Sequence, residues 1–151
     1  MNYCSTTRTN YFHVLPGKEQ EFEEFAKTLR GEDEVLLFKE KDKEGTPVYG
    51  FGVYGCLDGA ADPNLEDGSD EQWEEVCENG WHRLVQKLQE FLAPDDAVII
   101  FHAGNEGLRY ISANYDIITK ERTKSADMTG TALIDAADIL GNPNWDSRCE
   151  Y

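Results

Sequence analysis

The segment of residues 69–92 constrains the fold more than any other part of this chain. Ser69 and Gln72 have the spacing of a capping box, in which side chains at the start of a helix satisfy backbone amides. Apolar residues then recur every three or four positions, which predicts one long amphipathic helix ending before Pro94. This apolar stripe consists of Trp73, Val76, Cys77, Trp81, Leu84, Leu88, Phe91 and Leu92. We therefore expect Cys77 to lie in the core rather than to act as a reactive thiol.

Runs of β-branched and aromatic residues on both sides of this helix predict strands. The predicted strands cover residues 8–15, 34–41, 46–55, 97–102 and 108–119, with a further short strand at 122–128. Residues 42–45 and 104–107 have the composition of hairpin turns. Residues 56–69 contain glycine, proline and acidic residues without periodicity, which indicates a surface loop. Helical spacing predicts two more helices, at residues 18–29 and 131–140.

The connections between these elements favour an antiparallel sheet, because hairpins rather than helical crossovers join most neighbouring strands. The predicted fold class is α+β: a largely antiparallel sheet with two longer helices and one short C-terminal helix packed on it. A length of 151 residues suits one hydrophobic core, and no linker or repeat divides the chain. We expect residues 1–151 to form a single domain.

Negative charge is concentrated in the middle third of the chain. The formal net charge is -16, and no Lys or Arg occurs between Glu44 and His82. Such a field repels nucleic acid and anionic membranes and attracts basic protein surfaces. We therefore expect no direct binding of nucleic acid and no membrane association. The expected partner is the basic surface of a host protein that itself binds nucleic acid.

Eight acidic residues form the predicted partner-binding surface. They are Asp62, Glu66, Asp67, Asp70, Glu71, Glu74, Glu75 and Glu78. The last four are expected to be neighbours on one exposed face of the long helix. Carboxylates about one helical turn apart, ~5.4 Å, can imitate part of a phosphate backbone. The alternative interpretation is an acidic face that only keeps the protein in solution.

Other motifs predict no catalytic residue, no cofactor and no metal. Residues 50–55 match G-x-G-x-x-G, but no helix follows to meet a phosphate, so we interpret these glycines as sites of sheet bending or close backbone approach. The three histidines lack metal-ligand spacing, and the acidic residues of 58–70 lack the calcium-loop pattern. Cys56 and His102 are the pair that folding would have to bring together for a catalytic site.

Two arginines on predicted strands have ordinary structural interpretations. Arg8 and Arg109 are expected to pair with carboxylates, and Glu106 is the natural partner for Arg109. The four cysteines contain no C-x-x-C, and residues 1–10 are polar without the apolar core of a signal peptide. We therefore expect a cytoplasmic protein whose cysteines are thiols.

Four segments together resemble a group of known proteins. They are STTRTNYFHV at 5–14, YGFGVYG at 49–55, VIIFHAGNEGLRY at 98–110 and LGNPNW at 140–145. The sequence is similar in these segments to small acidic proteins of bacterial mobile elements, that is, phages and integrative conjugative elements of gut Firmicutes. The resemblance implies a setting and transfers no residue role. Small acidic proteins in that setting often disarm host nucleases by occupying their DNA-binding surfaces.

The expected function combines this setting with the charge. It is a non-enzymatic acidic binding protein that inhibits a host defence nuclease of the restriction or CRISPR type by mimicking nucleic acid. The alternative is an immunity-type or housekeeping interaction protein whose acidic surface only confers solubility. An enzyme without a recognisable motif ranks third.

Overall fold

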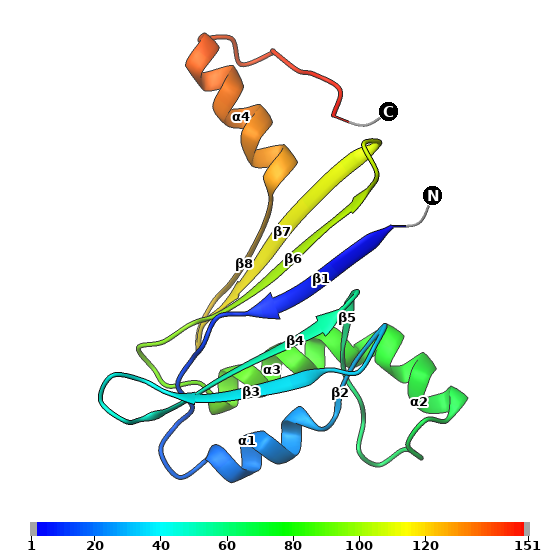
Figure 1. Cartoon of the computed structure of the whole chain (residues 1–151), viewed down its shortest axis with the longest axis vertical. Coiled ribbons are helices and arrows are strands. Elements are labelled where there is room, and N and C mark those ends of the chain that lie inside the picture. Colours follow the sequence, from blue (N-terminus) through cyan, green and yellow to red (C-terminus); the bar gives the residue numbers. More distant parts are fainter. Residues whose placement is uncertain (1–2, 150–151) are drawn as a thin grey trace.

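A computed structural model describes residues 3–149, and Figure 1 shows the arrangement of its elements. The strands are β1 (Cys4–Thr9), β2 (Leu29–Gly31), β3 (Leu36–Lys41), β4 (Pro47–Tyr54), β5 (Leu57–Ala60), β6 (Val98–Glu106), β7 (Tyr110–Ile118) and β8 (Thr123–Asp127). The helices are α1 (Glu19–Ala26), α2 (Asp70–Glu75), a π-helical segment η1 (Val76–Gly80), α3 (Trp81–Phe91) and α4 (Met128–Leu140).

Six strands form one antiparallel sheet in the order β3-β4-β1-β6-β7-β8, and β2 pairs with β5 separately. The predicted α+β class with a largely antiparallel sheet is confirmed. The predicted hairpin at residues 42–45 is confirmed as well, since the amide of Asp42 donates to the carbonyl of Thr46 at 2.9 Å. The second hairpin turns later than predicted, because β6 continues to Glu106.

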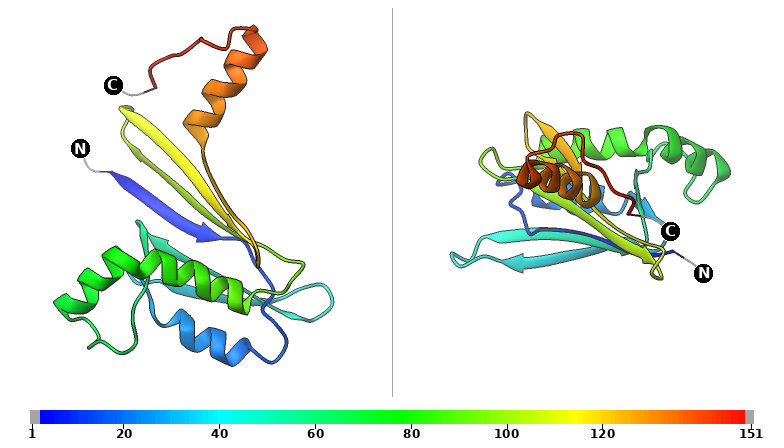
Figure 2. Two further views of the ribbon diagram at one scale, coloured as in Figure 1. Left: turned by 180° about the vertical axis from the view of Figure 1, so that it is seen from behind. Right: turned by 90° about the horizontal axis from the view of Figure 1, so that it is seen from above.

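The hydrophobic core lies between one face of the sheet and the helices α1 and α3. Phe22 of α1 is fully buried and meets Phe12 edge-on with ring centroids 5.6 Å apart. It also contacts Phe91 at the end of α3, at 5.8 Å. Seen from above, α3 lies on one side of the sheet (Figure 2, right). The core is therefore built on the half of the sheet that carries β4 and the beginning of β6.

Gly50 and Gly52 of the G-x-G-x-x-G match lie inside β4, and Gly55 follows the end of that strand, so no helix follows the glycines, as expected from the sequence. A Cβ atom at Gly52 would come within 3.0 Å of the carbonyl oxygen of Thr7 on the neighbouring strand β1. Close approach of another backbone, rather than phosphate binding, accounts for this glycine.

Two predictions about the N-terminal half are wrong in detail. The first strand begins at Cys4 and ends at Thr9, so residues 10–15 contribute only two isolated bridges, Phe12 with Tyr49 and Val14 with Leu92. Residues 56–69 are not simply a surface loop, because residues 57–60 form β5 and bury Ala60 against the core. Strand β5 pairs with β2, in which Leu29 is buried. This pairing could not be predicted, because the sequence of β5 is short and contains Asp58 and Gly59.

The long helix is confirmed, with Ser69 as its N-cap: the Ser69 hydroxyl accepts from the amide of Gln72 at 3.1 Å. Its buried face, however, differs from the predicted stripe. The helix widens into a π-helical turn at η1, and from Gln72 to Leu88 the residues that it buries recur every four positions. They are Gln72, Val76, Gly80, Leu84 and Leu88, and Phe91 at the end of α3 is buried as well. Trp73 and Cys77 are exposed, so the prediction that Cys77 lies in the core is wrong.

The C-terminal helix α4 extends away from the rest of the molecule (Figure 1). It starts at Met128, three residues earlier than predicted, because the Asp127 carboxylate caps it by accepting from the amide of Gly130. Strand β8 pairs with β7 only from Asn114 to Ile118, and α4 continues past the unpaired part of β7. Residues 142–149 then run back along the helix (Figure 2, left).

Candidate functional site

The eight acidic residues predicted to bind a partner lie on the loop 61–69 and on the helix that follows it, at one corner of the molecule (Figure 1). Six of them are exposed: Glu66, Asp67, Asp70, Glu71, Glu74 and Glu78. We call these six residues the acidic edge. Asp62 and Glu75 are half-buried. The structure therefore brings the predicted residues together on one segment but does not expose all of them equally.

Glu75 is held inside the molecule by Arg83. The two guanidinium nitrogens of Arg83 contact both carboxylate oxygens of Glu75, one of them at 2.8 Å, and Arg83 also donates to the carbonyl of Ala60 at 2.7 Å. The hydrogen bond from Arg83 lowers the pKa of Glu75. This pair ties the helix to β5, so Glu75 stabilises the fold rather than facing a partner.

Among the described residues, one further carboxylate of the predicted set forms an ion pair. Asp67 pairs with Arg30 at 2.7 Å but remains largely exposed. Within residues 3–149 no ion pair involves the other five members of the acidic edge, namely Glu66, Asp70, Glu71, Glu74 and Glu78. Their charges are therefore presented to solvent.

A strip of exposed apolar side chains runs beside the acidic edge, and the sequence analysis placed this strip in the core. Trp73 is 52% exposed and Trp81 is 36% exposed, with Cys77 exposed between them. We call these three residues the tryptophan strip. Their spacing of four residues keeps them on one side of a helix that contains a π turn.

The acidic edge and the tryptophan strip are adjacent by helix geometry. Each of Glu74 and Glu78 follows a member of the strip by one residue, a rotation of roughly 100° around the helix. The buried residues lie on the other side of the strip, again one position away. The helix surface thus presents two parallel rows, one aromatic and one anionic, and only the anionic row could be predicted from the sequence.

The side chain of His13 joins two loops by contacting one aspartate in each, Asp42 and Asp96, and we call these three residues the His13 clasp. One ring nitrogen contacts Asp96 at 2.8 Å, the other contacts Asp42 at 2.8 Å, and the Asp96 carboxylate also accepts from the His13 amide at 2.7 Å. Hydrogen bonds from Asp42 and Asp96 raise the pKa of His13, and the bond from His13 lowers the pKa of Asp42. Both ring nitrogens are occupied, so this histidine connects the β3–β4 turn to the segment before β6.

Cys56 and His102, the pair considered for catalysis, have different partners. His102 contacts the hydroxyl of Thr7 at 2.9 Å and that of Tyr3 at 3.0 Å. Burial raises the pKa of the Cys56 thiol, and the neighbouring Glu32 raises it further. A raised pKa keeps the thiol protonated and weakens it as a nucleophile.

The two arginines singled out in the sequence, Arg8 and Arg109, make contacts within the protein. Arg109 pairs with Glu106 at 3.6 Å, as predicted. Arg8 does not behave as expected, because its guanidinium lies 4.3 Å from the ring centre of Phe38 and makes a cation–π contact instead of the predicted ion pair.

Among the described residues 3–149, no three His, Cys, Asp or Glu side chains gather as a metal site would require. Across the same residues, every helix is too short or too polar to cross a membrane.

Comparison with known proteins adds no relative: no family model, no curated protein and no solved structure matches this chain.

Proposed function

We propose that this protein is a non-enzymatic binding protein that docks its acidic edge and tryptophan strip onto the basic surface of another protein. The observation that carries the proposal is the exposure of Trp73 and Trp81 beside a row of carboxylates. Solvated acidic faces are common, but exposed tryptophans placed next to them are not required for solubility.

The two rows supply different parts of a binding energy. Tryptophan is enriched among the few residues that dominate protein interfaces, because it buries a large area with few rotamers. Carboxylates at the rim accelerate association with a basic surface and select against acidic ones. A partner that matches both rows carries Lys or Arg residues around an apolar pocket.

A nucleic-acid-binding protein is the partner class that best fits the charge. Its binding surface is basic because it must neutralise phosphates. Carboxylates on successive helical turns present negative charge at a spacing near that of a phosphate chain. Together with the resemblance to mobile-element proteins, this supports inhibition of a host defence nuclease of the restriction or CRISPR type, in the cytoplasm. The competing hypothesis is an acidic surface that only confers solubility.

The test compares two triple variants with equal charge change. Glu71→Gln, Glu74→Gln and Glu78→Gln neutralise the acidic edge, whereas Glu34→Gln, Glu44→Gln and Glu121→Gln neutralise exposed carboxylates elsewhere. Capture of proteins from a bacterial lysate and inhibition of purified restriction or CRISPR nucleases are measured at about 50 mM and about 500 mM salt.

We expect the acidic-edge variant to lose about tenfold or more in association rate at low salt and little at high salt, since screening removes the steering term. Trp73→Ser should weaken binding at both salt concentrations, because it removes apolar contact. If the two triple variants bind equally well and Trp73→Ser has no effect, the surface serves only solubility.

A further inference from the structure

The arm formed by α4 carries an apolar surface that the rest of residues 3–149 leaves uncovered. On the helix, Ile139 is 87% exposed and Ile134 is 65% exposed, and Met128 and Leu140 are exposed as well. Ala137 is the buried residue of this helix. At the tip of the adjacent β6–β7 hairpin, Leu108 is 92% exposed and Ile111 is 61% exposed. Phe101 extends the patch along β6.

Such a surface is unusual for a protein that works alone. Soluble monomers rarely expose contiguous apolar patches larger than a few hundred Å². A helix of 13 residues is also marginal by itself in water, so its stability must come from packing of its apolar face. The described chain supplies only part of that packing.

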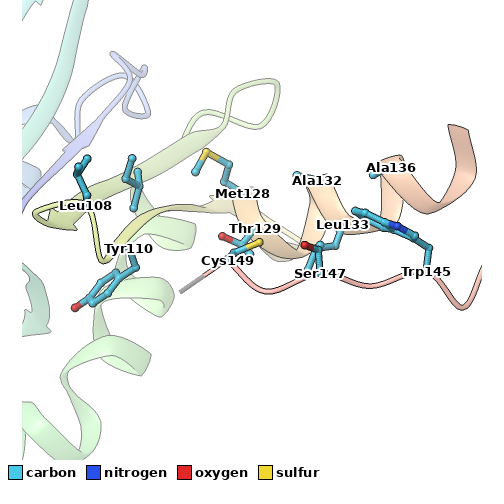
Figure 3. A pocket seen from close by; sticks show the side chains of 11 residues that line it. Leu108, Tyr110, Met128, Thr129, Ala132, Leu133, Ala136, Trp145, Ser147 and Cys149 are labelled. Carbon is cyan, nitrogen blue, oxygen red and sulfur yellow. The ribbon is translucent and has the colours of Figure 1, made fainter. Parts of the chain in front are cut away.

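Helix α4 protrudes, and grooves lie beside it, so the arm offers both a ridge and a groove to a second copy of the chain. Grooves lie on both sides of α4, and Met128 and Ala132 line both of them. The first groove, with a volume of about 550 Å³, runs between α4, the β6–β7 hairpin and the returning segment near Trp145 (Figure 3). The second, about 410 Å³, opens between α4 and the β6–β7 surface at Phe101 and Tyr115. Both grooves run beside the first part of α4, between Met128 and Ala136. The protruding helix of one copy can therefore dock into a groove of the other, the self-complementary arrangement that a two-fold interface requires.

The distribution of charge favours a second copy over the basic partner of the acidic edge. Residues 1–96 contain 22 acidic and nine basic residues, whereas residues 97–149 contain seven acidic and five basic ones. Helix α4 contains neither Lys nor Arg, and its acidic residues are Asp135 and Asp138. Two chains of charge -16 repel each other, and they repel least when they meet through their least charged part.

The exposed area is also sufficient. Seven large apolar side chains are exposed in this region: Phe101, Leu108, Ile111, Met128, Ile134, Ile139 and Leu140. At roughly 100 Å² each, they approach the ~800 Å² that each partner contributes to a standard interface. We propose that α4 and the grooves beside it form a symmetric interface with a second copy of this chain, separate from the acidic edge.

The experiment measures the molar mass of the intact chain in solution by sedimentation equilibrium from about 1 to about 100 µM, the range that resolves micromolar dissociation. The wild type should reach twice the monomer mass of 17.1 kDa. The double variant Ile134→Glu, Ile139→Glu should remain at 17.1 kDa over the whole range, because it places charge on the arm without touching a buried side chain.

A matched control separates the interface from the added charge. Leu36→Glu, Tyr54→Glu adds the same charge at exposed apolar positions on β3 and β4, at the opposite edge of the sheet from β8, and should still dimerise. Hydrogen exchange provides the location: amides of α4 should exchange more slowly at high concentration in the wild type and not in the arm variant. A wild type that stays monomeric at about 100 µM overturns the proposal. So does a dimer that the arm variant leaves intact.

Discussion

Gly59 of β5 lies directly against Gly80 at the end of the π-helical segment. A Cβ atom built on Gly59 would come within 2.2 Å of the carbonyl carbon of Gly80, and Gly59 also has a positive φ of 137°. Both features require glycine, since a side chain here would collide with backbone that cannot move aside. This contact brings β5 against the wide turn of the helix and sets which side of the helix is buried.

We expect Gly59→Ala to lower the free energy of unfolding by more than about 3 kcal/mol, because strain at positive φ adds to the collision with Gly80. The control is Gly17→Ala, which shares the positive φ but has open space around it, and should cost only about 1 kcal/mol. Urea unfolding of both variants measures the difference. Equal costs would show that β5 does not pack on the helix as described.

The His13 clasp should make stability depend on pH. The pKa of His13 is raised above its ordinary 6.5, so its contribution is complete below that value and is lost as the pH rises through the raised pKa. The pKa of Asp42 is lowered below 3.8, so its contribution is lost only as the pH falls through that lower value. His13→Gln should therefore reduce the melting temperature more at about pH 5.5 than at about pH 8.5. His82→Gln, at an exposed position on α3, is the control.

Neighbouring glutamates on the long helix should respond differently to the same substitution. Glu75→Gln should lower the free energy of unfolding by on the order of 1 kcal/mol, because it removes the charge that pairs with the half-buried Arg83. Glu74→Gln should change it by less than about 0.5 kcal/mol, since Glu74 is exposed. Chemical denaturation of the two variants provides the comparison. A destabilised Glu74→Gln variant with an unaffected Glu75→Gln variant would contradict the assignment of Glu75 to the fold.

The protein itself should not bind nucleic acid. Affinity for a duplex comes from the neutralisation of phosphates by Lys and Arg, and here 14 such residues face 30 acidic ones. Fluorescence titration with duplex DNA and with RNA near 150 mM salt should show no binding tighter than about 10 µM. Micromolar binding would overturn this prediction and the mimicry that depends on it.

The elements of the fold were predictable where the signal is local. The β3–β4 hairpin, the Ser69 cap and the strands β6 and β7 depend on turn residues, capping groups and side-chain period within a few positions. Strand β5 was missed because its four residues, Leu57 to Ala60, contain Asp58 and Gly59 and form a strand only by pairing with β2. Pairing between distant segments leaves no period in a stretch this short.

The same distinction applies to the proposed binding surface: the acidic edge could be predicted from the sequence, whereas the tryptophan strip could not. Exposure of Glu71, Glu74 and Glu78 follows from charge alone, because burying unpaired carboxylates is costly. Exposure of Trp73 does not, since an α-helical period places it with the core residues.

The sequence by itself determined the order of the helices and of the six strands of the main sheet, their antiparallel connections and the concentration of negative charge around the long helix. Only the tertiary structure decided which faces the helices present. The contact of Gly59 with Gly80 accompanies a π turn that rotates Trp73 into solvent, and the short pairing of β8 leaves α4 beyond the sheet with Ile134 and Ile139 uncovered. Local periodicity predicts that a helix has an apolar side. Which side of the helix is buried depends on contacts between residues far apart in the chain.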